Sequence, residues 1–425
     1  MKNSVQFRGI PYAEPPVGQL RFKEPKKLEN KLIDFDATQF PNRSAQDEWD
    51  PEQKFYQKEF YNDSIYRTTI SEDSLYLNIW APEINENKLK PVMLYIHGGA
   101  FLSGTGHEIE FRTEEYAEKD ILLVTINYRL GIFGFLTHPW LYEESQKSCG
   151  FYGILDQIAA LEWIQKNIAA FGGDPKNITI CGQSAGAMSV ETLLATPLAN
   201  DKFHKAIIQS GGGYPQYLIT NPKLEEAFDF GEKLMNKVGI NNLEELRNVS
   251  TEELLEVQHF AMSITDNGRL PFGPVINKQA LEESVSEAIA NGNIHSVPII
   301  IGSTKDDITV SDEEKKTGTN QMLESNVNFS LKLEHKLNNP CYVYYFTHDL
   351  PGDEAGAFHS GDLWYTFGTL KKSWRPFEAE DYQLSNTMIN YWSNFIATGN
   401  PNGQGLDLWE KCTDNNSFVK NFDIQ

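Results

Sequence analysis

One short stretch constrains the fold of this chain more than any other, because it describes a strand, a sharp turn and a helix. The β-branched run at 178–181 predicts a strand, and the apolar segment at 187–194 predicts a helix. Between them, residues 182–186 read Gly-Gln-Ser-Ala-Gly, and the two glycines avoid side chains that would collide with the turn or with a neighbouring strand. Such a turn lifts the Ser184 hydroxyl out of the backbone, where a nearby base can make it a nucleophile.

The composition indicates a globular protein that can bury a large core. Of its 425 residues, 40% are hydrophobic and 23% are charged. The net charge of −22 argues against nucleic acid and anionic membranes as partners. The first residues lack the apolar region of a secretory signal, and no stretch is long and apolar enough to span a bilayer. We therefore predict a cytoplasmic protein, although a secreted chain whose signal peptide had been removed would look the same.

The four cysteines lie far apart in the sequence. Cys149, Cys181, Cys341 and Cys412 do not have the spacing of metal ligands, and two of them lie in strand-like runs. We predict that they are reduced, that no disulfide forms, and that no metal is bound.

Apolar runs alternate with helical segments along the chain. Two segments with helical spacing are expected to form helices, at 156–171 and 382–397. Strands are expected at 92–97, 121–126, 178–181, 206–209, 298–301 and 342–346. Strands that are apolar throughout and separated by helices indicate an α/β fold with a mostly parallel sheet covered on both faces.

Two polar insertions interrupt this alternation without forming domains of their own. Residues 216–290 are charged and helical in pattern, and residues 308–338 are polar with a helical piece at 328–337. We expect a single domain over 1–425, with both insertions above the carboxyl ends of the strands, where open parallel sheets bind ligands.

A glycine-rich turn follows the expected strand at 92–97. The backbone N–H groups of Gly99 and Ala100 can approach a negatively charged oxygen there, and the N–H of Ala185 can complete the site. We expect His97 to shape this turn rather than to take protons.

One histidine and two neighbouring aspartates follow Ser184 in the chain. His359 lies among small residues after the strand at 342–346, in a setting that suits a general base. Asp306 and Asp307 follow the strand at 298–301, where a carboxylate can orient the imidazole. Residue chemistry alone does not distinguish these two aspartates.

Further motifs occur in a fixed order over nearly the whole chain. They lie at residues 7–22, 72–78, 127–131, 153–157, 171–175, 209–211 and 398–402. Together with the serine turn, they resemble the type-B carboxylesterases, the α/β-hydrolase family that includes bacterial p-nitrobenzyl esterases and the cholinesterases. The resemblance implies Ser184 as nucleophile, His359 as base and Asp307 as the orienting acid. It also implies a supporting role for Ser210.

The sequence departs from this family at several positions. Gln183 stands where a glutamate is usual, which removes one buried charge beside Ser184, and Asp307 stands where a longer glutamate is usual. Ser44 and Ser74 occupy positions where animal relatives form a disulfide. The segment between Asp307 and Tyr342 is shorter than usual, so we predict a reduced cap and a more open pocket.

The sequence suggests three possible functions. The leading hypothesis is a serine carboxylesterase that hydrolyses small-molecule esters through an acyl-enzyme intermediate and needs no metal or cofactor. The second is a non-catalytic adhesion module, but relatives of that kind have lost members of the catalytic triad. The third is a choline ester hydrolase, but no tryptophan stands just before Glu72, where cholinesterases hold choline. The sequence carries no signal of oligomeric state.

Overall fold

The structure is a computed structural model of the chain. It describes residues 4–29, 34–48, 54–61, 67–84, 88–145, 148–216, 218–219, 221–265, 269–308, 310–311, 313–314 and 320–424. Within this part of the chain, all four cysteines are buried and have free thiols. No described helix is both long enough and apolar enough to cross a membrane.

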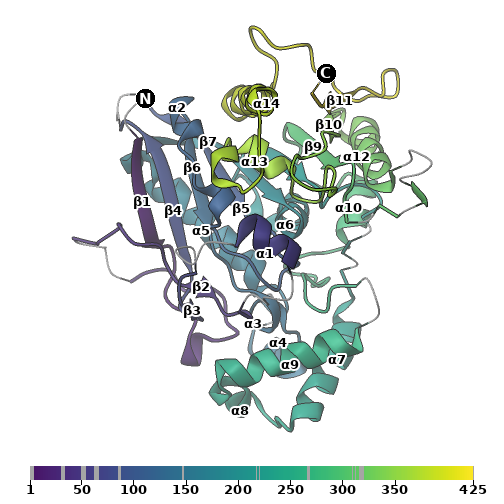
Figure 1. The fold of residues 1–425 in the computed structure, drawn as a ribbon. Helices are drawn as coiled ribbons and strands as arrows, with labels where there is room; N and C mark the ends of the chain where they lie inside the picture. Colours follow the sequence, from purple (N-terminus) through teal and green to yellow (C-terminus); the bar gives the residue numbers. More distant parts are fainter. Residues whose placement is uncertain are drawn as a thin grey trace.

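A mostly parallel sheet forms the centre of the molecule (Figure 1). In spatial order its strands are β1 (Ser4–Pro11), β4 (Tyr76–Pro82), β6 (Leu122–Ile126), β5 (Lys90–Ile96), β7 (Gly173–Gln183), β8 (Lys205–Gln209), β9 (Ile299–Thr304), β10 (Tyr342–Phe346) and β11 (Val419–Phe422). Strand β4 pairs antiparallel with both β1 and β6, and the other neighbouring pairs are parallel. A small second sheet pairs β2 (Arg43–Ser44) with β3 (Ile70–Ser71). The predicted mostly parallel sheet is confirmed.

The edge strands β1 and β11 and the antiparallel strand β4 are absent from our prediction. The two edge strands mix polar and apolar residues, whereas central strands are buried on both faces and are apolar throughout. The central strand β7 is also longer than the predicted run at 178–181, because its first half is partly exposed and polar.

Helices lie on both faces of this sheet and in the two insertions. They are α1 (Lys54–Phe60), α2 (Glu115–Glu118), α3 (Gly131–Phe135), α4 (Pro139–Glu144), α5 (Tyr152–Asn167), α6 (Ala185–Ala195), α7 (Leu224–Val238), α8 (Leu243–Asn248), α9 (Thr251–Ile264), α10 (Val285–Asn291), α12 (Gln321–Leu337), α13 (Asp362–Thr366) and α14 (Ala379–Thr398). Strand side chains point alternately to the two faces, so Leu94 and Ile96 of β5 join one core while Met93 and Tyr95 join the other. The first core contains α5, α6 and α12, and the second contains α13 and α14.

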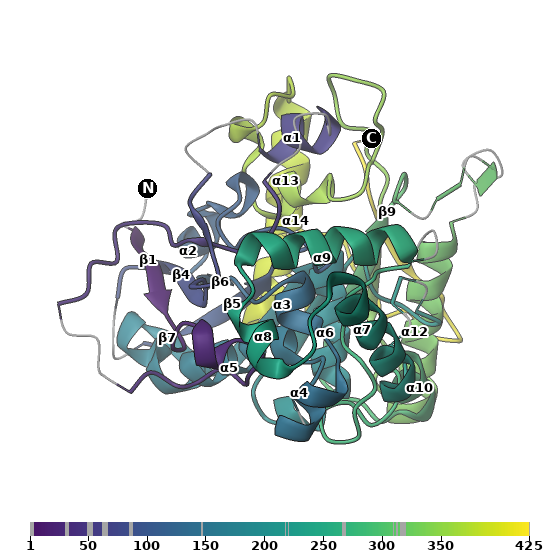
Figure 2. The same cartoon turned by 90° about the horizontal axis from the view of Figure 1, so that it is seen from below.

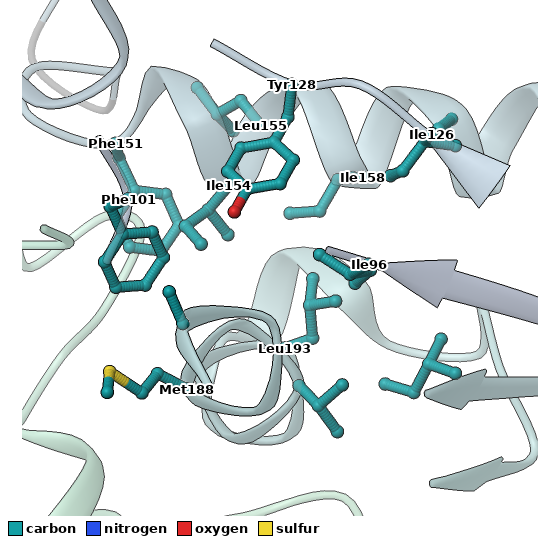
Figure 3. Close-up of a cluster of buried hydrophobic side chains, with 14 of the residues drawn as sticks. Ile96, Phe101, Ile126, Tyr128, Phe151, Ile154, Leu155, Ile158, Met188 and Leu193 are labelled. Carbon is teal, nitrogen blue, oxygen red and sulfur yellow. The ribbon is translucent and has the colours of Figure 1, made fainter. Parts of the chain in front are cut away.

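The core beneath the serine turn is formed by β5, β6, α5 and α6. Figure 3 shows Leu193 of α6 and Ile158 of α5 beside Ile96 of β5, and Met188 of α6 nearer to Phe101, all of them buried. Helix α5 begins at Tyr152, before the predicted start at 156, because its first turn is as buried as its middle and gives no amphipathic signal. The predicted helix end at 171 corresponds to a 3₁₀ turn, which stops at Gly172 with φ of 83°.

The two insertions contain helices in different places. Helices α7, α8 and α9 lie together on the far side of the molecule from α14, and α9 packs against α3 (Figures 1 and 2). Helix α12 packs against β9, β10 and α10, so it covers the sheet. The interpretation of the insertions as a reduced cap within one domain stays a prediction.

Candidate active site

The strand β7 and the helix α6 hold Ser184 in the sharp turn that the sequence predicts. Ser184 has φ of 58° and ψ of −125°, and its N–H donates to the carbonyl oxygen of Gln209 at 2.9 Å. A Cβ atom on Gly182 would lie 2.3 Å from the carbonyl oxygen of Gly186, and one on Gly186 would lie 2.0 Å from that of Ile96. Glycine is therefore required at both positions to let α6 approach β5 and β7.

The predicted oxyanion turn follows β5 directly. Gly99 and Ala100 both have positive φ, 98° and 56°, and the N–H groups of Leu102 and Ser103 donate to the carbonyl oxygen of Gly99. Within the described part of the chain, the N–H groups of Gly99 and Ala100 donate to no protein acceptor. Ala185 is the first residue of α6, where backbone N–H groups have no partner inside the helix. All three N–H groups are thus available to a ligand.

The buried side chain of His97 stabilises this turn. Its ring stacks on Tyr128 with a centroid distance of 4.6 Å, and its Nδ1 lies 2.9 Å from the carbonyl oxygen of Gly98. Burial lowers the pKa of His97 to about 4. It is therefore neutral at pH 7, as expected for a residue that shapes the turn.

The structure brings His359 to Asp307 rather than to Asp306. The Nδ1 of His359 lies 2.6 Å from Oδ1 of Asp307, and Thr304 donates to the other carboxylate oxygen through its N–H and its hydroxyl. Asp306 instead accepts a hydrogen bond from the N–H of Ala357 at 3.0 Å. The two neighbouring carboxylates therefore do different things: one contacts the imidazole, and the other anchors the loop that carries it.

Asp307 is ionised in this setting. Burial raises its pKa, but His359, with smaller contributions from Ser210 and the N–H of Thr304, outweighs burial and leaves the pKa below the ordinary value. Ser210 is itself buried, with φ of 49°, and its N–H donates to the carbonyl oxygen of Gly302 at 2.8 Å. Its Oγ makes no hydrogen bond to a described residue, so the supporting role of Ser210 stays a prediction.

Gln183 contacts the other ring nitrogen of His359. Its side-chain Nε2 lies 3.1 Å from Nε2 of His359, and an amide NH₂ can only donate. The imidazole Nε2 therefore accepts, which leaves the ring proton on Nδ1, facing Asp307. In the described structure the Ser184 hydroxyl makes no hydrogen bond to a protein group. Contacts of this kind often form only in the substrate complex.

A cavity of about 790 Å³ opens over these residues. Ser184, His359 and the turn at 98–100 line one part of it. Helix α1 contributes Tyr56, Gln57 and Phe60, and helix α9 contributes Gln258, His259 and Met262. Glu108 and Glu110 also line it. We did not predict these wall residues, because no local motif marks a side chain that reaches a pocket from a distant loop. Among the described residues, no cluster of His, Cys, Asp or Glu has the arrangement of a metal site.

The sheet topology, the serine turn and the Asp307–His359 pair define a protein of the α/β-hydrolase fold. The model of the carboxylesterase family matches residues 1–333 and 315–425, so the chain belongs to this family and is a carboxylic ester hydrolase.

Several known proteins are similar to this chain. The para-nitrobenzyl esterase of Bacillus subtilis (strain 168) is 33% identical over 451 residues, which cover 95% of this chain and 88% of that protein. Carboxylesterase 5A of Felis catus is 32% identical over 486 residues, which cover 97% and 85%. The solved structure of a thermophilic PNB esterase superposes with a TM-score of 0.86 at 30% identity and covers 99% of this chain and 93% of that one.

Proposed function

We propose that this protein hydrolyses carboxylic esters by acyl transfer through Ser184, with His359 as general base and Asp307 as the orienting acid. One observation carries the proposal. His359, held at 2.6 Å by Asp307, lines the same cavity as Ser184 and the turn that contains Gly99 and Ala100. Nucleophile, base, orienting group and oxyanion donors are the four parts that acyl transfer needs.

In the first half-reaction, Nε2 of His359 takes the hydroxyl proton as Oγ of Ser184 bonds to the ester carbonyl carbon. The carbonyl oxygen gains the negative charge, and the N–H groups of Gly99, Ala100 and Ala185 stabilise it. When the bond to the alcohol oxygen breaks, the imidazolium returns its proton to that oxygen, and the alcohol leaves. The acyl group is then esterified to Ser184.

In the second half-reaction, water replaces the alcohol. Nε2 of His359 takes a proton from water as its oxygen bonds to the acyl carbon, and the same N–H groups stabilise the new oxyanion. The bond to Oγ then breaks, and Ser184 recovers the proton from the imidazolium. The ionised Asp307 stabilises the imidazolium in both halves, and no metal or cofactor enters either step.

Covalent labelling tests this proposal. A fluorophosphonate should phosphonylate the nucleophile, because its phosphorus mimics the tetrahedral centre and fluoride leaves. We expect one label per chain, located at Ser184 by peptide mass spectrometry, and none on Ser184→Ala. A label on another residue, or equal labelling of Ser184→Ala, would exclude Ser184 as the nucleophile.

We infer that Gln183 is a positioning residue for His359. Its amide donates to the nitrogen that must accept the Ser184 proton, so it fixes the productive tautomer while the site is empty. The amide must release Nε2 when Ser184 attacks.

Gln183→Glu should shift the pH dependence of the reaction. A carboxylate at this position stabilises the imidazolium form of His359, so a larger fraction of the enzyme lacks a free base at low pH. We expect the acid limb of kcat/KM to move to higher pH by about one unit, with most activity recovered above pH 8. The measurement is kcat/KM for p-nitrophenyl butyrate from pH 5 to 9, with Gln57→Glu as a control that adds a charge at another cavity position. If the acid limb were unchanged, Gln183 would not influence the protonation of His359.

A further inference from the structure

Two buried glutamates in the cavity wall take no part in the acyl-transfer steps. Glu108 and Glu110 lie on the loop between β5 and α2, and they line the same cavity as Ser184 and His359. Only 7% of Glu108 and 2% of Glu110 is exposed. Carboxylates are rarely buried without a partner, so their place in a substrate cavity calls for a functional reason.

Glu108 is fixed by groups of its own loop and of the chain after α1. The N–H of Thr105 donates to its Oε1 at 2.9 Å, and Tyr61 also hydrogen bonds to it. The carboxyl therefore has a defined position, facing its neighbour Glu110.

The carboxyl group of Glu110 has fewer hydrogen-bond partners than that of Glu108. Its Oε2 is buried and has no hydrogen-bond partner among the residues that the structure describes. Its backbone is held, because the hydroxyl of Thr369 donates to its carbonyl oxygen at 3.0 Å. A carboxylate oxygen without a donor from a described residue thus lies beneath the cavity wall that Glu110 lines, and a donor on a ligand that reaches it can satisfy it.

The pair shares protons at neutral pH. Burial raises the pKa of Glu108 to about 7, although hydrogen bonds from Glu110, Thr105 and Tyr61 oppose it. Burial and the charge on Glu108 raise the pKa of Glu110 well above its ordinary value. The pair therefore carries at most one negative charge near pH 7, with a proton of Glu110 shared toward Glu108.

Charged and titratable groups surround the pair. They are Tyr61, Tyr95, Tyr128, Arg43, Arg112 and Lys372. Both arginines hydrogen bond elsewhere: Arg43 to Glu48 and to the carbonyl oxygen of Thr68, and Arg112 to the carbonyl oxygen of His107. The charge of Arg43 lowers the pKa of Glu108, and the charge of Arg112 lowers that of Glu110.

Aromatic rings complete this part of the cavity. Phe60, Tyr61 and Phe111 line it together with the two glutamates. Ring faces attract cations, and their low polarity strengthens a charge-assisted hydrogen bond. A primary ammonium has three donors, enough to reach Oε2 of Glu110 and an oxygen of Glu108 together. A quaternary ammonium has none and leaves the acceptor unsatisfied.

We propose that Glu108 and Glu110 form a recognition site for a primary ammonium group, so that the enzyme prefers esters that carry an amine at the end of a chain. The inference rests on the proposed function, because the amine is recognised while the ester lies at Ser184. Binding of the cation displaces the shared proton from the pair. The KM for an amino ester should therefore fall as pH rises through about 7, whereas that of a neutral ester should lack this component.

A matched substrate series tests this inference. The probes are butyrate esters of alcohols that end in a primary amine, a trimethylammonium group or a methyl group, each with four, five and six intervening carbons. A second series places the same groups at the end of the acyl chain. For at least one chain length, we expect kcat/KM for the amine to exceed that for the methyl ester about tenfold, with the trimethylammonium ester close to the methyl ester.

Two variants of Glu110 and one control variant test whether this residue recognises the amine. Glu110→Gln keeps the size of the side chain, and Glu110→Leu removes both oxygens; each should abolish the amine preference while leaving hydrolysis of the methyl ester within about threefold. Glu232→Gln removes the same charge from the exposed face of α7 and should keep the preference. Hexylamine should also inhibit p-nitrophenyl butyrate hydrolysis competitively in the wild type and not in Glu110→Leu.

Several outcomes would overturn the inference. They are no amine preference in either series, equal preference for the trimethylammonium ester, or a preference that survives in both Glu110 variants. These outcomes are distinct from failure of the proposed function. If Ser184 is labelled and p-nitrophenyl butyrate is hydrolysed while the amine has no effect, only the recognition site is excluded.

Discussion

Ser184→Ala is expected to reduce kcat for p-nitrophenyl butyrate by roughly 10⁴- to 10⁶-fold, because the acyl-enzyme cannot form and only the oxyanion donors and substrate binding remain. His359→Ala should reduce kcat to a similar extent, since the hydroxyl then has no base. The double variant should be little worse than either single one, because the two residues act as a unit. Stopped assays at high enzyme concentration measure the residual rate.

The fold should be unaffected by either change, which separates loss of chemistry from loss of structure. Ser184 and His359 are replaced by smaller side chains at the cavity wall, so circular dichroism and the unfolding midpoint should stay close to the wild type. A Ser184→Ala variant that keeps more than a tenth of the activity would favour another nucleophile. A wild-type protein without esterase activity would favour the non-catalytic adhesion hypothesis.

Asp307→Asn should have the second largest effect, a loss of about 10³- to 10⁴-fold in kcat. The amide keeps the volume but has no charge to stabilise the imidazolium, and its NH₂ favours the unproductive tautomer of His359. In the wild-type structure, Oδ1 of Asp307 lies 2.6 Å from Nδ1 of His359.

Asp306→Asn is the matched control for this prediction. Asp306 accepts a hydrogen bond from the N–H of Ala357, and the amide oxygen of asparagine can still accept it. We therefore expect a loss of less than tenfold in kcat, with a small decrease in stability. If Asp306→Asn were the more damaging variant, the orienting acid would have to be reassigned to Asp306.

Much of the fold was predictable from local pattern. The central strands and the helices α5 and α14 consist of contiguous residues whose apolar spacing repeats, so their type could be read without a partner. The edge strands could not, because a strand such as β11, Val419–Phe422, has a polar sequence and is a strand only through its pairing with β10. The start of α5 was missed because burial on all sides removes the helical period from the sequence.

The candidate site also has parts that the sequence predicts and parts that only the folded chain shows. The serine turn and the glycine-rich turn that we predict to bind the oxyanion could be located in the sequence, because each is a continuous motif with glycines at fixed positions. The cavity walls were not found, because α1, α9 and the loop with Glu108 and Glu110 come together only in the folded chain. A glutamate at 110 looks like an ordinary surface residue until the fold buries it.

The sequence by itself determined the position of Ser184, the mostly parallel sheet that carries it and the family to which the chain belongs. These depend on neighbouring residues and on the order of motifs along the chain. The tertiary structure decided that Asp307 rather than Asp306 contacts His359, that Gln183 donates to the imidazole, and that a buried glutamate with one unsatisfied oxygen lines the cavity above Ser184. The physical reason is that adjacent side chains in an extended segment point in different directions, and only long-range packing sets which of them meets a partner.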